Sequence, residues 1–243
     1  MKSFGKYIIL MSTLFVRREK FSVYWKLTID ECILIGTNSI FIVAIVSSFI
    51  GAVTCIQTAA NLVSPLVPIY VVASVVREMS ILELAPTFTC VVLAGKVGSS
   101  IAGQLGTMRI TEQIDALEVM GINSASYLIL PKILASLITI PMLVTFAGLL
   151  SILGGYIAGI MGNIISTQDF IYGIQIDFNE FNVTFALIKA FVFAFLISSI
   201  SAFQGYFTKG GALEVGQSST SAVVKSCIAV LVADLALAQL LLN

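Results

Sequence analysis

Residues 32–76 read CILIGTNSIFIVAIVSSFIGAVTCIQTAANLVSPLVPIYVVASVV and contain no Asp, Glu, Lys or Arg. An uncharged stretch of this length cannot cover a water-exposed surface, and about 20 apolar residues are enough for one helix to cross a bilayer. We therefore predict a first membrane-spanning helix over residues 36–58. Polar and proline residues between positions 61 and 68 then interrupt the pattern, and a short apolar helix is expected up to residue 76.

The rest of the chain has the same apolar character. Of its 243 residues, 58% are hydrophobic and 11% are charged, whereas a soluble domain usually carries about 25% charged residues. Four further apolar stretches predict spans over residues 84–108, 131–161, 183–207 and 219–242. The sequence thus predicts an all-α integral membrane protein with five transmembrane helices.

The N-terminal region differs from these spans. Its apolar run, residues 7–16, is flanked by basic residues and is too short to cross a bilayer, so we expect an N-terminal interfacial helix. We predict one domain over residues 1–243, with an interfacial helical region over 1–35 and a transmembrane bundle over about 36–242.

The distribution of basic residues predicts the orientation. Six of the first 26 residues are Lys or Arg, whereas residues 162–182 contain three acidic residues and no basic one. Basic residues favour the cytoplasmic side of a membrane. We therefore expect a cytoplasmic N-terminus, an external 162–182 loop and a periplasmic C-terminus, with residues 109–121 returning to the cytoplasm.

Several function classes find no support in the sequence. It has no His, its four cysteines are far apart, and its formal net charge is zero, which gives no indication of a metal site or a nucleic-acid partner. Lys96 follows Gly95 but precedes Val97, so the GxxxxGK[ST] phosphate-binding loop is missing. We predict a chain that is not an enzyme and holds no cofactor, with ATP and Mg²⁺ bound by a separate partner.

Residues 111–123, TEQIDALEVMGIN, form the most polar helical stretch between two predicted spans. Glu112, Asp115 and Glu118 recur every three residues and form one charged stripe. A short cytoplasmic helix with one charged and one apolar face suits the docking of a soluble partner. A solvated connector helix is the alternative interpretation.

The order Asp115-Ala-Leu, Gly121 and Ile129-Leu-Pro resembles the coupling-helix motif of ABC-transporter permeases. Longer runs, LAGKVGSS at 93–100, GTMRITEQIDALEVMG at 106–121 and GQSSTSAVV at 216–224, resemble the MlaE (YrbE-like) family of permeases. From this resemblance we expect the ATPase-coupling residues to be Arg109, Glu112, Gln113, Asp115, Glu118, Gly121 and Pro131.

The family resemblance also implies a function and a set of partners. It implies a homodimer in a bacterial cell inner membrane, with a cytoplasmic ABC ATPase, a periplasmic MCE-domain lipid-binding protein, and phospholipid as the transported substrate. Two alternatives stay open: an ABC permease for another hydrophobic or small solute, and a secondary transporter. The latter usually needs midplane carboxylates and inverted repeats, for which the sequence offers Glu83 at most.

Charged residues near membrane depth are the candidates for lipid binding, because each costs about 2.5–3.5 kcal/mol to insert unless it lines a cavity or is paired. The family has an Arg-Glu-Leu-x-Pro run, but Leu82 stands at its Arg position, so Arg77 is the possible substitute. The expected lipid-binding residues are Gln57, Arg77, Glu78, Glu83 and Lys96.

Other interpretations of these residues stay open. Arg77 and Glu78 could anchor the chain at the membrane interface, and Gln57 could bond a neighbouring helix instead of a headgroup. Lys132 and Asp234 are expected to snorkel to the interface. Lys96 and Lys189 lie deeper, where each could pair with Glu83 or with a lipid phosphate.

Overall fold

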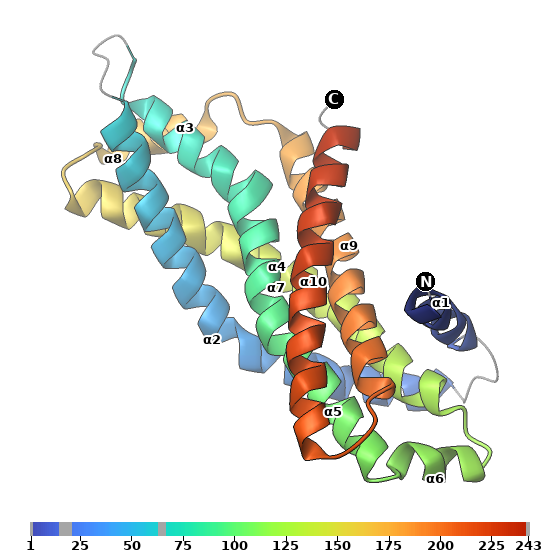
Figure 1. The fold of residues 1–243 in the computed structure, drawn as a ribbon. Helices are drawn as coiled ribbons and strands as arrows, with labels where there is room; N and C mark the ends of the chain where they lie inside the picture. The colour runs from blue at the N-terminus through green and yellow to red at the C-terminus, as the bar shows by residue number, and fades with distance from the viewer. Residues whose placement is uncertain (1, 15–20, 63–66, 242–243) are drawn as a thin grey trace.

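The computed structural model describes residues 2–14, 21–62 and 67–241, and helices are the only regular structure within these ranges (Figure 1). In chain order the elements are α1 (Lys2–Thr13), α2 (Phe21–Asn61), α3 (Tyr70–Met79), η1 (Ser80–Phe88), α4 (Thr89–Leu93), η2 (Ala94–Gly98), α5 (Ser99–Ile110), α6 (Gln113–Val119), α7 (Ser124–Met161), α8 (Thr167–Gln175), α9 (Glu180–Tyr206) and α10 (Ala212–Leu241).

Five of the described helical segments are long and apolar enough to cross a membrane. They cover Ser22–Asn61, Tyr70–Ile110, Ser124–Met161, Glu180–Tyr206 and Ala212–Leu241. The prediction of an all-α membrane protein with five spans is therefore confirmed.

The predicted break before the second span is wrong. Segments α3, η1, α4, η2 and α5 follow one another without a turn, so Tyr70–Ile110 is one rod. Pro86 lies inside η1, a π-helical segment. Proline lacks an N–H group and its ring collides with the carbonyl four residues earlier, and the wider π turn gives the ring room without ending the helix.

Two other predicted boundaries also differ from the structure. The third long helix begins at Ser124 instead of after Pro131, because Asn123 caps it by accepting a hydrogen bond from the Ser126 N–H group at 3.3 Å. The expected loop over residues 162–182 contains α8, which is capped in the same way by Ser166. A single capping residue was too weak a signal to predict either start.

Helices α2 and α7 cross in close contact. A Cβ atom on Gly51 would overlap the Ser151 carbonyl group, and one on Gly154 would overlap the Ser48 carbonyl group. Inside a bilayer the hydrophobic effect does not drive helices together. Small residues instead stabilise their contact, because they let the two backbones approach this closely. The crossing fixes α2 against the centre of the bundle.

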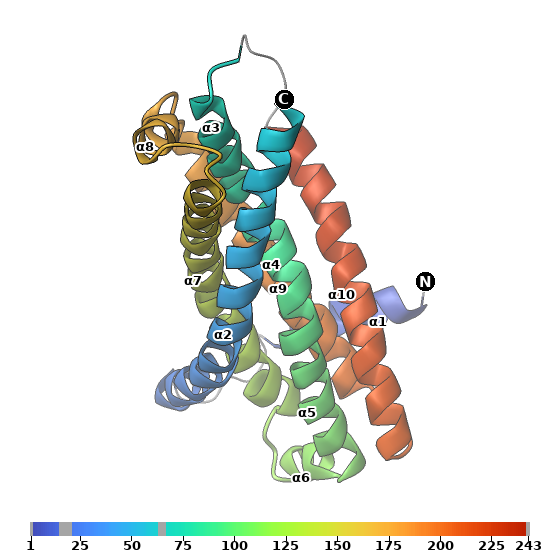
Figure 2. The same ribbon diagram turned by 90° about the vertical axis from the view of Figure 1, so that its left-hand side faces the viewer.

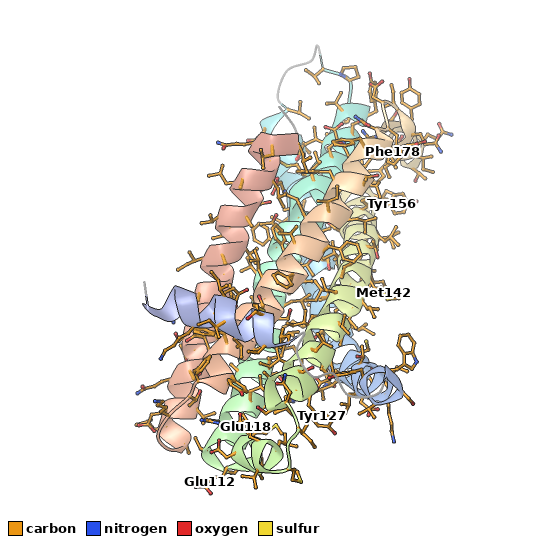
Figure 3. The ribbon with its side chains drawn as sticks, turned by 90° about the vertical axis from the view of Figure 1, so that its right-hand side faces the viewer. Glu112, Glu118, Tyr127, Met142, Tyr156 and Phe178 are labelled. Carbon is orange, nitrogen blue, oxygen red and sulfur yellow. The ribbon has the colours of Figure 1, made fainter. Side chains whose placement is uncertain are left out.

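The bundle has two distinct ends (Figures 1 and 2). We call the end that carries α6 the α6 end, and the opposite end, with α8 and the C-terminus, the α8 end. The start of α2 lies at an angle to the rest of the helix at the α6 end, without any helix boundary at residue 36. Helix α1 lies across α9, where the Tyr7 hydroxyl donates to Ser199 Oγ at 2.8 Å. Figure 3 places Glu112 and Glu118 at one end of the molecule and Phe178 at the other.

Candidate functional site

Backbone geometry sets α6 apart as a separate short helix at the α6 end. Glu112 has a positive φ of 58°, which turns the chain away from α5. At the other terminus Gly121 has φ 81°, and the Ile122 N–H group donates to the Leu117 carbonyl at 3.0 Å. This is a glycine-dependent helix ending, in which a left-handed residue satisfies the last carbonyl groups. Gly121 therefore shapes α6 through its backbone.

The charged residues of α6 make contacts within the protein. The Arg109 guanidinium pairs with Asp115 at 2.7 Å, which links the end of α5 to α6. Glu118 Oε1 accepts hydrogen bonds from the Ser124 hydroxyl at 2.8 Å and from the Tyr206 hydroxyl at 3.2 Å. Of the predicted stripe, Glu118 thus holds α6 against α7 and α9 and Asp115 holds it to α5, while Glu112, like Gln113, is exposed.

Two large apolar residues of this corner are exposed. Val119 is 89% exposed and Met120 is 65% exposed, whereas Ile114 on the opposite side of α6 is fully buried. The expected coupling residues did not include Val119 and Met120, because that set followed the acidic stripe and the family motif. Pro131, by contrast, is buried in α7 and is not part of the exposed surface of α6.

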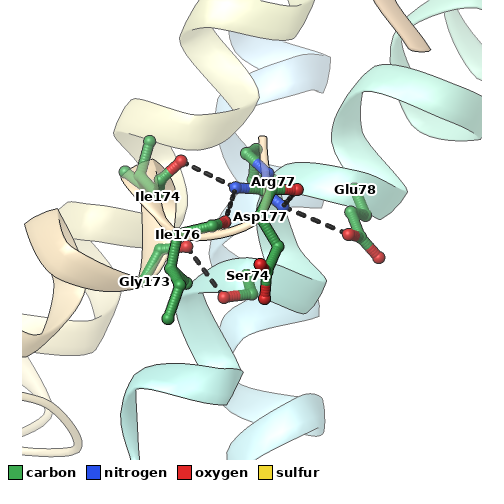
Figure 4. A network of polar contacts seen from close by, with 7 residues as sticks. All are labelled: Ser74, Arg77, Glu78, Gly173, Ile174, Ile176 and Asp177. Carbon is green, nitrogen blue, oxygen red and sulfur yellow. Dashed lines mark hydrogen bonds and ion pairs between the residues drawn. The ribbon is translucent and has the colours of Figure 1, made fainter. Parts of the chain in front are cut away.

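At the α8 end, Arg77 connects α3 to the segment after α8 (Figure 4). Its side chain is buried, and Nη1 donates to the carbonyls of Ile174 at 2.7 Å and Ile176 at 2.6 Å. Its Nη2 donates to the Asp177 carbonyl at 3.4 Å and pairs with Glu78 at 3.1 Å. Arg77 therefore satisfies backbone carbonyls that helix α8 leaves open at its end.

A groove of about 350 Å³ begins beside Arg77 and runs between η1, α7 and α9. Of the described residues that line it, Arg77 alone is charged, and nearly all others are apolar. The groove is lined by Arg77, Ile81, Ala85, Val144, Thr145, Gly148, Leu149, Ile152, Ile174, Phe178, Val183, Ala186 and Leu187. It is an apolar slot that the buried and paired Arg77 side chain closes at one end.

Glu83 belongs to a charged cluster that joins three helices next to this groove. Lys189, which is fully buried on α9, pairs with Glu83 on η1 at 2.8 Å and with Asp234 on α10 at 2.6 Å. Its ammonium group also donates to the Leu82 carbonyl at 3.0 Å. The expectation that Asp234 snorkels is therefore wrong, because it is one of two carboxylates that compensate a buried cation.

The remaining candidates lie elsewhere. Gln57 is exposed on α2, and Glu78 is half exposed beside Arg77. The Lys96 ammonium group donates to the Asn38 carbonyl and does not pair with Glu83. Lys132 is buried and pairs with Glu31 at 2.5 Å, which corrects the expectation that it snorkels. The five expected lipid-binding residues thus do not form one cluster.

Comparison with known proteins agrees with this architecture. The family described as Permease MlaE matches residues 28–240. A probable ABC transporter permease protein of Rickettsia bellii is 34% identical over 239 residues, covering 98% of this chain and 92% of the relative. A similarly named protein of Synechocystis is 33% identical, covering 88% and 81%.

A plant protein is also similar. Protein TRIGALACTOSYLDIACYLGLYCEROL 1, chloroplastic, of Arabidopsis thaliana is 31% identical over 240 residues, covering 95% of this chain and 66% of the relative. The family match spans all five long helices except the first residues of α2 and the last residue of α10. The chain therefore belongs to the MlaE permease family and is an ABC-type permease subunit of a multi-pass membrane assembly.

Proposed function

We propose that this permease subunit moves phospholipid, powered by a separate ABC ATPase. The observation that carries the proposal is the groove beside Arg77, which is apolar along its length. The acyl chains of a phospholipid need such an apolar wall. The Arg77 guanidinium, already paired with Glu78 and three carbonyl groups, closes one end of the groove. The name of the plant relative contains that of a galactolipid, which has acyl chains but no phosphate, and so supports a lipid as the substrate without indicating its headgroup.

The groove favours a lipid over a small polar solute. A polar solute would lose its hydration in a slot lined by side chains such as Ile81, Val144 and Leu187, which offer no replacement hydrogen bonds. A secondary transporter would need titratable groups free to exchange an ion. Near the groove, Glu83 and Asp234 are instead held by Lys189, and Glu78 is paired with Arg77.

One surface supports the proposed ATPase partner. The exposed apolar pair Val119 and Met120 at the α6 end suits insertion into the ATPase subunit, and in that arrangement this end and the N-terminus would lie in the cytoplasm. The MCE-domain protein would then meet the α8 end in the periplasm of a bacterium, with the permease in the inner membrane.

The least buried spans support a homodimer. In the most apolar 18 residues of each span, the buried share is only 28% in α2 and 17% in α10, against 50–56% in the other three spans. Large side chains such as Phe41 and Phe49 project from α2, at 75% and 69% exposure. A second copy packed against this face would enlarge the apolar surface available to acyl chains.

The test is the phospholipid content of the purified permease–ATPase complex, measured by mass spectrometry of its extracted lipids. Leu149 lines the groove, so Leu149→Trp should fill it and lower bound phospholipid about tenfold. Leu231→Trp is the matched control, since Leu231 is similarly exposed on α10 but does not line the groove. Equal phospholipid in both variants and in the unmodified complex would refute the groove as the lipid site. ATP-independent transport would refute the ABC mechanism.

A further inference from the structure

A line of polar residues runs along one face of the second long helix at the α6 end. Lys96, Ser100, Gln104 and Thr107 are spaced by four, four and three residues, which places them one above another on a helix. Such a line inside an apolar span is costly unless the side chains serve a cavity or a partner.

Two cavities open onto this face, and they share Glu31 and Gln104. The larger, about 590 Å³, lies nearer α6 and is also lined by Thr107 and Lys132. The smaller, about 50 Å³, is also lined by Lys96, and by Asn38, Ser39 and Ser100. Together they form one polar track between the start of α2, α5 and α7, which we call the inner track.

The inner track carries excess positive charge. Lys132 is buried and its ammonium group contacts Glu31 at 2.5 Å and the Gln104 side-chain oxygen at 2.6 Å. Lys96 adds a second cation, so two lysines face one glutamate among the lining residues. The geometry leaves one net positive charge to be compensated.

Buried polar atoms in the inner track also lack partners. Glu31 Oε2 and the Ser39 hydroxyl are buried and have no hydrogen-bond partner among the residues that the structure describes. Ser39 is 1% exposed and lines the smaller cavity beside Lys96. A native protein seldom leaves buried polar groups unsatisfied. The Ser39 hydroxyl can donate to a phosphate oxygen, whereas Glu31 Oε2 can only accept, so it needs a hydroxyl group of a ligand or a water molecule.

Apolar residues of the larger cavity give this ligand its second part. Leu27, Met108 and Leu128 line it beside Thr107 and Lys132. A free phosphate ion would have no use for such an apolar wall. An anionic headgroup with an acyl chain would use both the polar and the apolar side chains.

We propose that the inner track binds the phosphodiester headgroup of a phospholipid, as a second site distinct from the groove beside Arg77. This inference rests on the proposed lipid transport and specifies a station for the lipid near the α6 end. Lys96 contacts the phosphate oxygens, and the Lys132–Glu31 pair fixes the charge of the site. A lipid leaving one station can then reach the other along the helix Tyr70–Ile110, which lines both.

The experiment measures binding of a short-chain phosphatidylglycerol to the purified complex by native mass spectrometry. The Leu149→Trp background fills the groove, so that the inner track is the site observed. Lys96→Gln should weaken binding about tenfold, the effect expected for losing one charge-assisted hydrogen bond. Lys225→Gln removes an exposed lysine of α10 and should leave binding unchanged. Lys96→Arg should restore binding, which separates loss of charge from misfolding.

The outcomes distinguish this inference from the proposed function. If the unmodified complex binds no phosphatidylglycerol, lipid transport itself is refuted. If it binds the lipid and Lys96→Gln binds equally well in the Leu149→Trp background, the inner track alone is refuted. Glycerol 3-phosphate is the probe for a free phosphate group. Binding of it as tight as that of the lipid would overturn the assignment to a lipid headgroup.

Discussion

Helices α6 and α8 each connect two long helices, but they are held in opposite ways. Arg77 binds three carbonyl groups after or within α8, and the Ser74 hydroxyl donates to the Gly173 carbonyl at 2.7 Å (Figure 4). α6 is held by one buried side chain, Ile114, and by hydrogen bonds at its surface.

The difference indicates that α8 is a structural connection, whereas α6 presents a surface to a partner. Burial of charge-assisted hydrogen bonds makes the α8 connection stable and closes the end of the groove. Exposed ion pairs contribute about 0–1 kcal/mol, so α6 depends mainly on its turns and on Ile114. A short helix held this loosely can adjust to a partner, and it carries exposed apolar residues to contact one.

The largest effect is expected from Arg77→Ala. It would leave the carbonyls of Ile174, Ile176 and Asp177 without their donor, and we expect a loss of about 3 kcal/mol of stability. Thermal unfolding of the purified protein measures the loss. Glu78→Gln is the control because Glu78 is half exposed, and it should change stability little. An unfolding temperature of Arg77→Ala equal to that of Glu78→Gln would remove the distinction between α8 and α6.

A smaller effect is expected from Gly173→Ala in α8. The added Cβ atom would overlap the Tyr70 carbonyl and lie 2.8 Å from the Ala73 Cβ atom, so α8 would have to move away from α3. Overpacking of this kind costs about 1–3 kcal/mol. Gly216→Ala is matched to it, since nothing lies within 4 Å of that Cβ position, and it should be neutral or slightly stabilising. The measurement compares the unfolding temperatures of the two variants. If Gly173→Ala unfolds at the same temperature as Gly216→Ala, α8 is loosely held.

Gly121→Ala should cost about 1 kcal/mol, because alanine disfavours the positive φ that ends α6. The loss should stay local. Hydrogen exchange should speed up about fivefold in the amides of α6 and not in those of α8. Faster exchange in both helices would mean that the two connections are coupled, contrary to the comparison.

The smallest change in stability is expected from Val119→Asp. Val119 is 89% exposed, so unfolding should shift by less than about 0.5 kcal/mol. ATP hydrolysis by the partner in the assembled complex should nevertheless fall about tenfold, since a charge would enter the proposed apolar contact. Glu112→Gln, another exposed change at this corner, should retain most activity. Normal hydrolysis by Val119→Asp would exclude Val119 from the coupling contact.

The sequence was sufficient for the number and type of the spans but not for their ends. Long apolar stretches determine a membrane helix, because every backbone group in lipid must be bonded within the helix. The break predicted between residues 76 and 84 followed from the charged residues Arg77, Glu78 and Glu83, but the helix Tyr70–Ile110 runs through them without interruption. It also accommodates Pro86, in a π-helical segment.

The charged contacts were harder to predict because pairing depends on helices distant in sequence. The pairing of Lys189 with Glu83 was one of the options from the sequence, whereas its pairing with Asp234 was not expected. Lys132 was expected at the interface, but Glu31, 101 residues away, holds it inside. The helix was predicted to have an apolar face, and Val119 and Met120, as apolar residues in a segment predicted to face water, could have been included among the coupling residues.

The continuous helix Tyr70–Ile110 connects the two ends of the molecule mechanically. It has 41 residues, which at about 1.5 Å per residue spans roughly 60 Å, about twice the thickness of the hydrocarbon core. A tilt of its α6 end, caused by closure of the ATPase subunits, would be transmitted to Arg77 along one continuous helix. The two π-helical segments within this helix are the places where it would bend instead.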